Sequence, residues 1–419
     1  MTDRHARSDL PGGLVALTER MPGVRSVAIG VWVRAGSVHE EREEMGVSHL
    51  LEHMVFKGTS RRSARDLALA LERLGGSLDA YTTREHTSYQ ARVLDEHADT
   101  ALDVLADLVL GPLLRAEDLD LEREVVLEEI STVEDTPDDQ VFDLHALQMW
   151  GDHPYGYPVL GTRDSVGRMT SGAVRNAHTR SYRSPNLIIA AAGSVDHAWF
   201  VDRVSSLFGD APSGGANGVV PPLPAVAPER CWIERDSAQT HIVIGAPSIP
   251  HGDPRRYAMV LLSSAFGGGM SSRLFQRVRE ELGLAYSVFS YQSFYAGAGV
   301  CGTYVGTRPE WADRAESVVM EELGQLAAAG LTVEELADAK GQVKGQLVLS
   351  LESSGARLHR LASTALFNEP FRTVEEVMAE VDAVSPEEIA SLSAQFHAPD
   401  LQHVLRLGPV SDSDSNRIG

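Results

Sequence analysis

Short apolar runs and longer amphipathic runs alternate along this chain, and the two kinds of run predict strands and helices. Residues 26–36, 186–195 and 240–249 are apolar and rich in small or β-branched side chains, which is typical of buried strands. Residues 97–110 and 116–135 instead place apolar side chains at helical spacing. The pattern predicts an α+β protein in which helices cover sheets.

Residues 1–210 predict one complete α+β unit. The strand at 26–36 precedes a helix within 46–59 and a helix at 63–76 that ends at a glycine pair. Two alternating segments within 77–94 predict a hairpin. The remaining elements of this half are helices at 97–110, 116–135 and 198–209 and a strand at 186–195.

Residues 230–419 repeat this order of elements after a linker at 211–229, where glycine and proline dominate. The likeness lies in element order and not in the letters. We therefore predict two similar α/β repeats, each a mixed, mainly antiparallel sheet covered by helices, with domains at 1–210 and 230–419. The elements of the second half are strands at 240–249 and 403–410, helices at 255–269, 272–283, 310–330 and 332–353, and a hairpin at 284–306.

Composition narrows the classes of partner. The 419 residues carry a net charge of −22, so no basic stripe exists to bind nucleic acid. The charge favours cationic partners such as basic peptides, or simply solvates the surface. Cys231 and Cys301 form neither a disulfide framework nor a thiolate metal site. No apolar run has the length of a signal peptide core or a membrane span, so we expect a cytoplasmic protein with no membrane partner.

One short motif carries chemistry: His-Leu-Leu-Glu-His, residues 49–53. On a helix, His49 and His53 share one face, and two imidazoles so placed can hold one Zn²⁺ with room for a third ligand and a water. Glu52 would project beside the metal as a general base acting on metal-bound water. The order is that of inverted zincins. The alternative is a pair of partly exposed histidines on an amphipathic helix.

A downstream helix offers carboxylates for the third ligand. Glu122 and Glu129 are seven residues apart and therefore lie on nearly the same helical face, while Glu124 and Glu128 are further candidates. One glutamate could ligate while another supports the site from behind. The alternative is a solvated helix face. We expect the apolar Val125, Val126 and Ile130 to anchor this helix in a core. A carboxylate that faces the metal from such a helix favours a functional role.

Residues 46–59, 74–112 and 121–139 together resemble the pitrilysin/insulysin family of zinc peptidases. The likeness is closest to the branch that contains the mitochondrial processing peptidase β-subunit and its bacterial relatives, and it extends from about Leu10 to Val410. In that family, the third ligand is a glutamate about 75 residues after the motif. The resemblance therefore implies one zinc ion per chain held by His49, His53 and Glu129, with Glu52 as the base and Glu122 as a supporting carboxylate.

The second half has no such motif, so the resemblance implies one catalytic and one non-catalytic repeat. In the family, an arginine and a tyrosine in this half reach the active site, and here they are Arg279 and Tyr286. An arginine could hold a carbonyl or carboxylate of the substrate, and a tyrosine could stabilise an oxyanion. From the residues alone, Arg279 reads as a surface side chain and Tyr286 as a core side chain. Gly267–Gly269 are either a flexible loop or a helix C-cap.

The family also binds substrate as an added strand, which implies Leu78, Asp79, Ala80 and Tyr81 along the binding groove. Glu85 and His86 are interpreted as polar strand and turn residues, and His153 as a loop residue. The family encloses a chamber between its two halves and pairs two chains of this length. We expect a homodimeric zinc endopeptidase for extended or unfolded peptides; the alternatives are a heterodimer with an inactive homologue and a non-catalytic structural or peptide-binding subunit.

Overall fold

The computed structural model describes residues 5–218 and 220–409, which form two compact units. Each unit draws on three separate stretches of the chain. The first unit consists of the described parts of Met1–Ser131, Tyr157–Val220 and Ser350–Phe371, and the second of those of Thr132–Gly156, Pro221–Leu349 and Arg372–Gly419. The expected strand at 403–410 and the resemblance up to Val410 both extend one residue beyond the described part.

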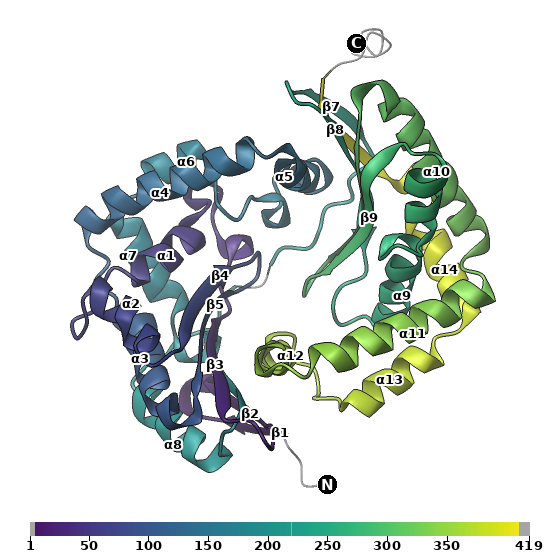
Figure 1. The fold of residues 1–419 in the computed structure, drawn as a ribbon. Helices are drawn as coiled ribbons and strands as arrows, with labels where there is room; N and C mark the ends of the chain where they lie inside the picture. The colour runs from purple at the N-terminus through teal and green to yellow at the C-terminus, as the bar shows by residue number, and fades with distance from the viewer. Residues whose placement is uncertain (1–4, 219, 410–419) are drawn as a thin grey trace. The chain divides into compact units, whose positions relative to one another are not determined.

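The first unit contains a six-stranded mixed sheet with the order β1-β2-β6-β3-β5-β4 (Figure 1). Strand β2 runs parallel to β6, and every other neighbouring pair is antiparallel. The strands are β1 His5–Asp9, β2 Val15–Arg20, β3 Ser26–Val33, β4 Ser77–Thr82, β5 Thr87–Leu94 and β6 Leu187–Gly193.

Both faces of this sheet are buried because its central strands are apolar on both sides. In β3, Val27, Ile29 and Val31 enter the larger core, which also contains residues of α1, α3 and α8. Ala28 and Trp32 face the other way and pack against α12. The helices of this unit are α1 Val47–Val55, α2 Ala64–Glu72, α3 Ala98–Leu110, α4 Ala116–Glu134, α6 Arg163–Arg168, α7 Ser171–Ser181, α8 His197–Phe208 and α12 Ser354–Leu366.

The second unit repeats the strand order of the first. Its sheet, β7-β11-β8-β10-β9, has one parallel pair, β7 with β11, followed by three antiparallel pairs. This matches β2-β6-β3-β5-β4 strand for strand, so the predicted α+β fold with two similar repeats is confirmed. The strands are β7 Arg230–Glu234, β8 Thr240–Ser248, β9 Ala285–Phe294, β10 Gly299–Thr307 and β11 His403–Gly408.

Helices also cover both faces of the second sheet. One core joins β8 and β10 to α9, α10 and α14, and a smaller core on the opposite face places Val141 of α5 against Val243 and Leu405. The helices of this unit are α5 Pro137–Trp150, α9 Arg256–Gly267, α10 Ala312–Ala329, α11 Val333–Ser350, α13 Val374–Ala383, α14 Pro386–Phe396 and the π-helix Phe275–Glu281.

Two helices are exchanged between the halves of the chain. Helix α12 comes from the second half but packs on β2, β3 and β6 in the first unit, and α5 comes from the first half but packs on β8 and β11 in the second unit. The compact units therefore differ from the predicted ranges 1–210 and 230–419. Within the linker, the described residues 212–218 and 220–229 form no helix or strand.

Candidate metal centre

Helix α1 presents the His-Leu-Leu-Glu-His motif on a firmly packed element. Leu50, Leu51 and Met54 are buried in the core of the first unit. This fixes the rotation of the helix and leaves His49 and His53 together on its other side, with ring centroids 4.7 Å apart. The two imidazoles are partly buried.

Glu129 of α4 faces both histidines. Its carboxylate oxygens lie 3.6 Å from His49 Nε2 and 3.6 Å from His53 Nε2. Two ligands about 2.0–2.1 Å from one tetrahedral ion lie about 3.3 Å apart, so these separations leave room for zinc. One ligand atom from each of the three residues lies within 4.8 Å of the others. The structure therefore brings together the three side chains that the resemblance implied.

Glu122 lies beside the Nδ1 edge of the His53 ring, two helical turns before Glu129 on the same face of α4. Its Oε2 accepts a hydrogen bond from His53 Nδ1 at 3.2 Å, and its Oε1 lies 2.5 Å from Lys57 Nζ. A carboxylate facing Nδ1 requires the proton to sit there, which leaves Nε2 with a free lone pair toward Glu129. The arrangement orients His53 for a metal.

His49 is also suited to bind a cation. Burial, with a smaller effect of the neighbouring His53, lowers the pKa of His49 to about 4. The ring is therefore neutral at neutral pH. Its Nδ1 is buried and has no hydrogen-bond partner among the residues that the structure describes, so the ring is held by packing.

Glu52 lies on the same helix with its carboxylate directed toward the hairpin. Thr82, at the end of β4, donates a hydrogen bond from Oγ1 to Glu52 Oε2 at 2.6 Å. Burial raises the pKa of Glu52, and the negative charge of Glu129 adds to this rise, while Thr82 and His53 oppose it. A raised pKa makes a carboxylate a better proton acceptor.

The predicted substrate residues lie on an edge strand. Strand β4 is the last strand of its sheet and pairs only with β5 among the described strands. Leu78 and Ala80 pack against the core beneath α1, so the alternation of the strand directs Asp79 and Tyr81 to the other face, where the Tyr81 hydroxyl lies 3.3 Å from His359 Nδ1.

Arg279 and Tyr286 lie in the second unit and contact each other. Arg279 Nη1 donates to the Tyr286 carbonyl at 3.1 Å, and its guanidinium carbon lies 4.5 Å from the centre of the Tyr286 ring. Tyr286 is 77% exposed, so its interpretation as a core residue is wrong. Gly267 ends α9 and Gly268 is its C-cap, which favours the C-cap interpretation of these glycines.

The expected anchoring of α4 is wrong in one residue. Val126 and Ile130 are buried, but Val125 is 44% exposed. The buried face of α4 follows Leu119, Glu122, Val126 and Ile130 at three- and four-residue steps, and position 125 falls outside that stripe. Glu124 and Glu128 are also exposed.

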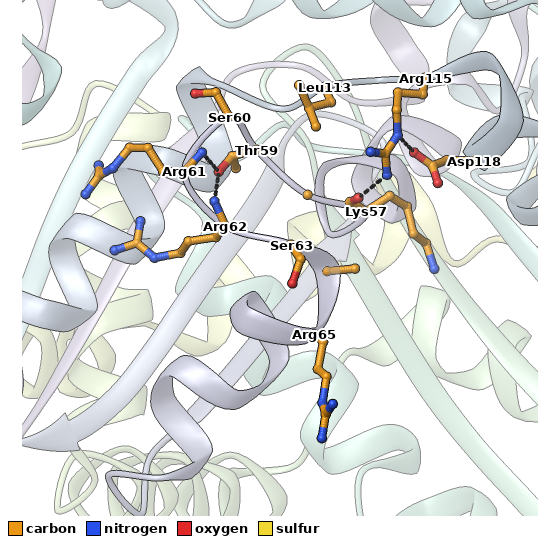
Figure 2. Close-up of a pocket in the computed structure, with 12 residues that line it drawn as sticks. Lys57, Thr59, Ser60, Arg61, Arg62, Ser63, Arg65, Leu113, Arg115 and Asp118 are labelled. Carbon is orange, nitrogen blue, oxygen red and sulfur yellow. Dashed lines mark hydrogen bonds and ion pairs between the residues drawn. The ribbon is translucent and has the colours of Figure 1, made fainter.

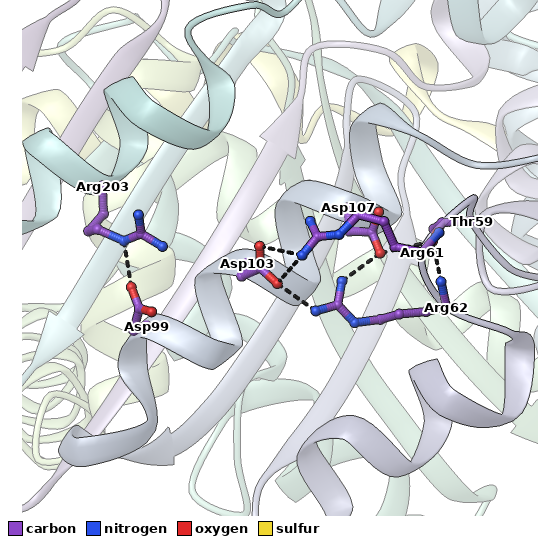
Figure 3. A network of polar contacts seen from close by, with 7 residues as sticks. All are labelled: Thr59, Arg61, Arg62, Asp99, Asp103, Asp107 and Arg203. Carbon is purple, nitrogen blue, oxygen red and sulfur yellow. Dashed lines mark hydrogen bonds and ion pairs between the residues drawn. The ribbon is translucent and has the colours of Figure 1, made fainter.

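The loop after α1 is tied to α3 by ion pairs (Figure 3). Arg61 and Arg62 both bind Asp103, and Arg62 and the Thr59 hydroxyl bind Asp107. This loop and the residues before α4 line a pocket of about 510 Å³ (Figure 2). In Figure 2 the guanidinium groups of Arg61 and Arg62 point away from Leu113, and Arg65 lies apart from them. The network therefore holds the loop that carries Lys57.

Three residues of the centre were missed by sequence reasoning: Lys57, Thr82 and Glu40, whose contact with α1 is described below. Lys57 follows His53 by four residues, just after the end of α1, and a lysine so close to the motif is a signal that could have pointed to a carboxylate partner such as Glu122. The contacts of Thr82 and Glu40 depend on how distant segments meet, so spacing alone could not identify them.

Comparison with known proteins assigns the family. The model described as Insulinase (Peptidase family M16) matches residues 15–163, and the Peptidase M16 inactive domain matches residues 168–343. An uncharacterized zinc protease of Streptomyces coelicolor is 40% identical and covers 98% of this chain and 91% of its own. The uncharacterized zinc protease YmxG of Bacillus subtilis is 39% identical, and the match covers 93% of this chain and 94% of that protein. The chain belongs to peptidase family M16.

Solved structures show the same fold. A protease from Helicobacter pylori superposes with a TM-score of 0.91 at 20% identity, covering 97% of this chain and 100% of that one. A peptidase M16 inactive domain from Pseudomonas fluorescens gives a TM-score of 0.92 at 21% identity, covering 97% and 98%. Separately, none of the helices in residues 5–218 and 220–409 is long and apolar enough to cross a membrane.

Proposed function

We propose that this protein is a zinc endopeptidase that hydrolyses extended or unfolded peptides, in the manner of a processing peptidase. The observation that carries the proposal is the group formed by His49, His53 and Glu129, with the Glu52 carboxylate on the same helix. The zinc proteases named among its relatives support the choice of metal. We propose one zinc ion per chain.

A zinc ion at this site would act as a Lewis acid toward the scissile carbonyl and the attacking water. Glu52 takes a proton from that water as its oxygen bonds to the carbonyl carbon. Glu52 then delivers the proton to the amide nitrogen as the carbon–nitrogen bond breaks, which leaves one new carboxyl group and one new amine. Thr82 orients Glu52 through its 2.6 Å hydrogen bond, and Glu122 orients His53.

The edge of β4 would receive the substrate as an added strand. Backbone groups on a free sheet edge bind any extended chain, so the affinity is largely independent of side chains. Leu78 to Tyr81 provide this edge, and Thr82 at its end leads directly to Glu52. A tightly folded protein could not present such a strand.

We propose further that Arg279 and Tyr286 assist the reaction, Arg279 by holding a carbonyl or carboxylate of the substrate and Tyr286 by stabilising the oxyanion. The exposure of Tyr286 and its contact with Arg279 support a role outside the core. We also propose a homodimer, with a heterodimer containing an inactive homologue as the alternative. A purely structural or peptide-binding subunit is the rival function, and the complete ligand set argues against it.

Two isosteric substitutions test the proposal. Glu52→Gln should keep the bound zinc and lower turnover of an unstructured peptide by at least ~100-fold, because only the proton acceptor is removed. Glu129→Gln should instead lower zinc content. Glu128→Gln is the matched control on an exposed position. Near-normal turnover in Glu52→Gln would show that another residue is the base, and wild-type protein that binds zinc but cleaves no peptide would favour the rival function.

A further inference from the structure

Glu40 is a buried carboxylate that the proposed reaction does not use. The residue is 5% exposed. Its Oε2 accepts a hydrogen bond from the Gly46 backbone N–H at 2.8 Å, and its Oε1 accepts one from the Ser48 backbone N–H at 2.7 Å. Both donors belong to the start of α1, and His49 directly follows Ser48. A carboxyl group buried at this point requires an explanation beyond solvation.

Helix α1 has no capping group of its own. Its N-cap residue is Gly46, which has no side chain, and its first turn contains no acidic residue. The first N–H groups of a helix need acceptors, and a negative charge there is favourable because the helix dipole is positive at this end. Glu40, nine residues before His49, supplies the acceptors, and its ionised form supplies the charge.

Gly46 cannot be replaced by an ordinary N-cap residue. Its φ is +88°, and a Cβ built there would lie 2.6 Å from the Leu160 carbonyl oxygen and 2.9 Å from Gly161 Cα. Both neighbours are backbone atoms, so the conflict could not be relieved by a side-chain movement. The cap must therefore come from another part of the chain.

The segment that carries Glu40 is also bound to the turn between β4 and β5. Val38 N–H donates to the Arg84 carbonyl at 2.8 Å, and the Thr87 hydroxyl donates to the Ala35 carbonyl at 2.9 Å. Thr82, which holds Glu52, lies at the start of the same turn. Residues 35–40 thus connect the beginning of the metal helix with the segment that orients the base.

We propose that Glu40 is a positioning residue for the metal centre: its two hydrogen bonds fix the start of α1 so that the His49 and His53 rings face Glu129. The inference rests on the proposed metal site. Two N–H groups facing two oxygens require both oxygens to accept, and a carboxylate satisfies this requirement. An amide offers one oxygen and one NH₂ group, so Glu40→Gln keeps the shape and loses one bond and the charge.

The test compares Glu40→Gln with Glu43→Gln, which removes the same charge at an exposed position of the same segment. Zinc affinity is measured by competition with a chromogenic chelator, and Co²⁺ is used as a spectroscopic substitute whose visible absorption reports the coordination geometry. We expect Glu40→Gln to weaken zinc binding about tenfold and to shift the Co²⁺ spectrum, and Glu43→Gln to match the wild type.

Unchanged zinc affinity and an unchanged Co²⁺ spectrum in a folded Glu40→Gln protein would overturn the inference, even if the variant unfolds more easily. If that variant does not fold, hydrogen exchange of the backbone amides in the wild type is measured instead. Slow exchange at Gly46 and Ser48 that zinc slows further supports the inference. Fast exchange at these two amides overturns it. Peptide cleavage is measured in parallel. If Glu40→Gln weakens zinc binding but the wild type cleaves no peptide, the inference about Glu40 stands and the peptidase proposal fails.

Discussion

At the scale of single residues, the proposed metal centre depends on groups that lie behind the proposed ligands. Lys57 binds Glu122 at 2.5 Å, and Glu122 binds His53 Nδ1 at 3.2 Å. Glu122 is 6% exposed, so its charge is expensive to bury without a cation beside it. The Lys57 ammonium offsets this cost, and Glu122 in turn orients the His53 ring through Nδ1.

The substitution Lys57→Met should lower zinc affinity about tenfold, because the Glu122 charge would lose its partner while the three ligands remain. The measurement is the dissociation constant of zinc by chelator competition. Arg65→Met serves as the control, because Arg65 is an exposed residue at the start of α2 that lines the same pocket. Equal zinc affinities for both variants and the wild type would show that Lys57 does not support the site.

Spacing in the sequence points to the proposed ligands more readily than to the residues that support them. His49, Glu52 and His53 follow from spacing on one helix, and Glu122 and Glu129 follow from a seven-residue spacing on another. The choice of Glu129 over Glu124 and Glu128 required the resemblance, since several glutamates share that helix. Thr82 and Glu40 act across contacts between separate segments, which no local spacing encodes.

At the scale of elements, α1 combines a packed apolar face, a metal-facing side and a cap supplied from outside. Burial raises the pKa of Glu40 from 4.5 to about 7, with Glu44 adding to the rise and the donors of Ser48 and Gly46 opposing it. The folded protein then retains a proton that the unfolded chain releases between about pH 4.5 and 7. Because a raised carboxyl pKa favours the folded state only while the group is protonated, stability falls as the pH rises through this window.

We therefore expect the free energy of unfolding of the metal-free wild type, relative to Glu40→Gln, to fall by about 3 kcal/mol between pH 4.5 and pH 8. Urea unfolding at several pH values measures this difference. The exposed Glu43→Gln variant should show no such trend. A difference between wild type and Glu40→Gln that does not change with pH would mean that Glu40 ionises normally in the folded protein.

Elements with a clear pattern were predicted, and elements with a weak one were not. Strands β3, β6 and β8 and helices α3, α4 and α10 lie close to the predicted ranges. Strand β1, with the sequence HARSD, is short and polar, and α5 spreads its apolar residues around the helix, so neither shows a period. The exchange of α5 and α12 between units depends on long-range packing.

At the scale of the whole molecule, the net charge of −22 bears on which peptides approach the protein. Its field should favour basic peptides at low ionic strength, since surface charges are screened beyond about 10 Å at ~0.1 M salt. We expect added salt to slow the cleavage of a disordered basic peptide more than that of a neutral peptide of equal length. The measurement is kcat/KM for both peptides over a salt series, and parallel slopes would contradict this expectation.

Repetition of one unit explains how a single chain carries one proposed metal centre and a second sheet of the same topology. Both sheets share their strand order, but the group of His49, His53 and Glu129 is the one metal-binding cluster found among the described residues. We propose that the second repeat instead binds substrate, through Arg279 and Tyr286.

The most direct test of the central claim is a zinc titration of metal-free protein, with cleavage of an unstructured fluorogenic peptide as the readout. We expect no cleavage without metal, a linear rise in activity, and saturation at one zinc ion per chain. His53→Ala should remain inactive throughout the titration. Full activity in protein shown to be metal-free would contradict the claim that zinc held by His49, His53 and Glu129 drives peptide hydrolysis.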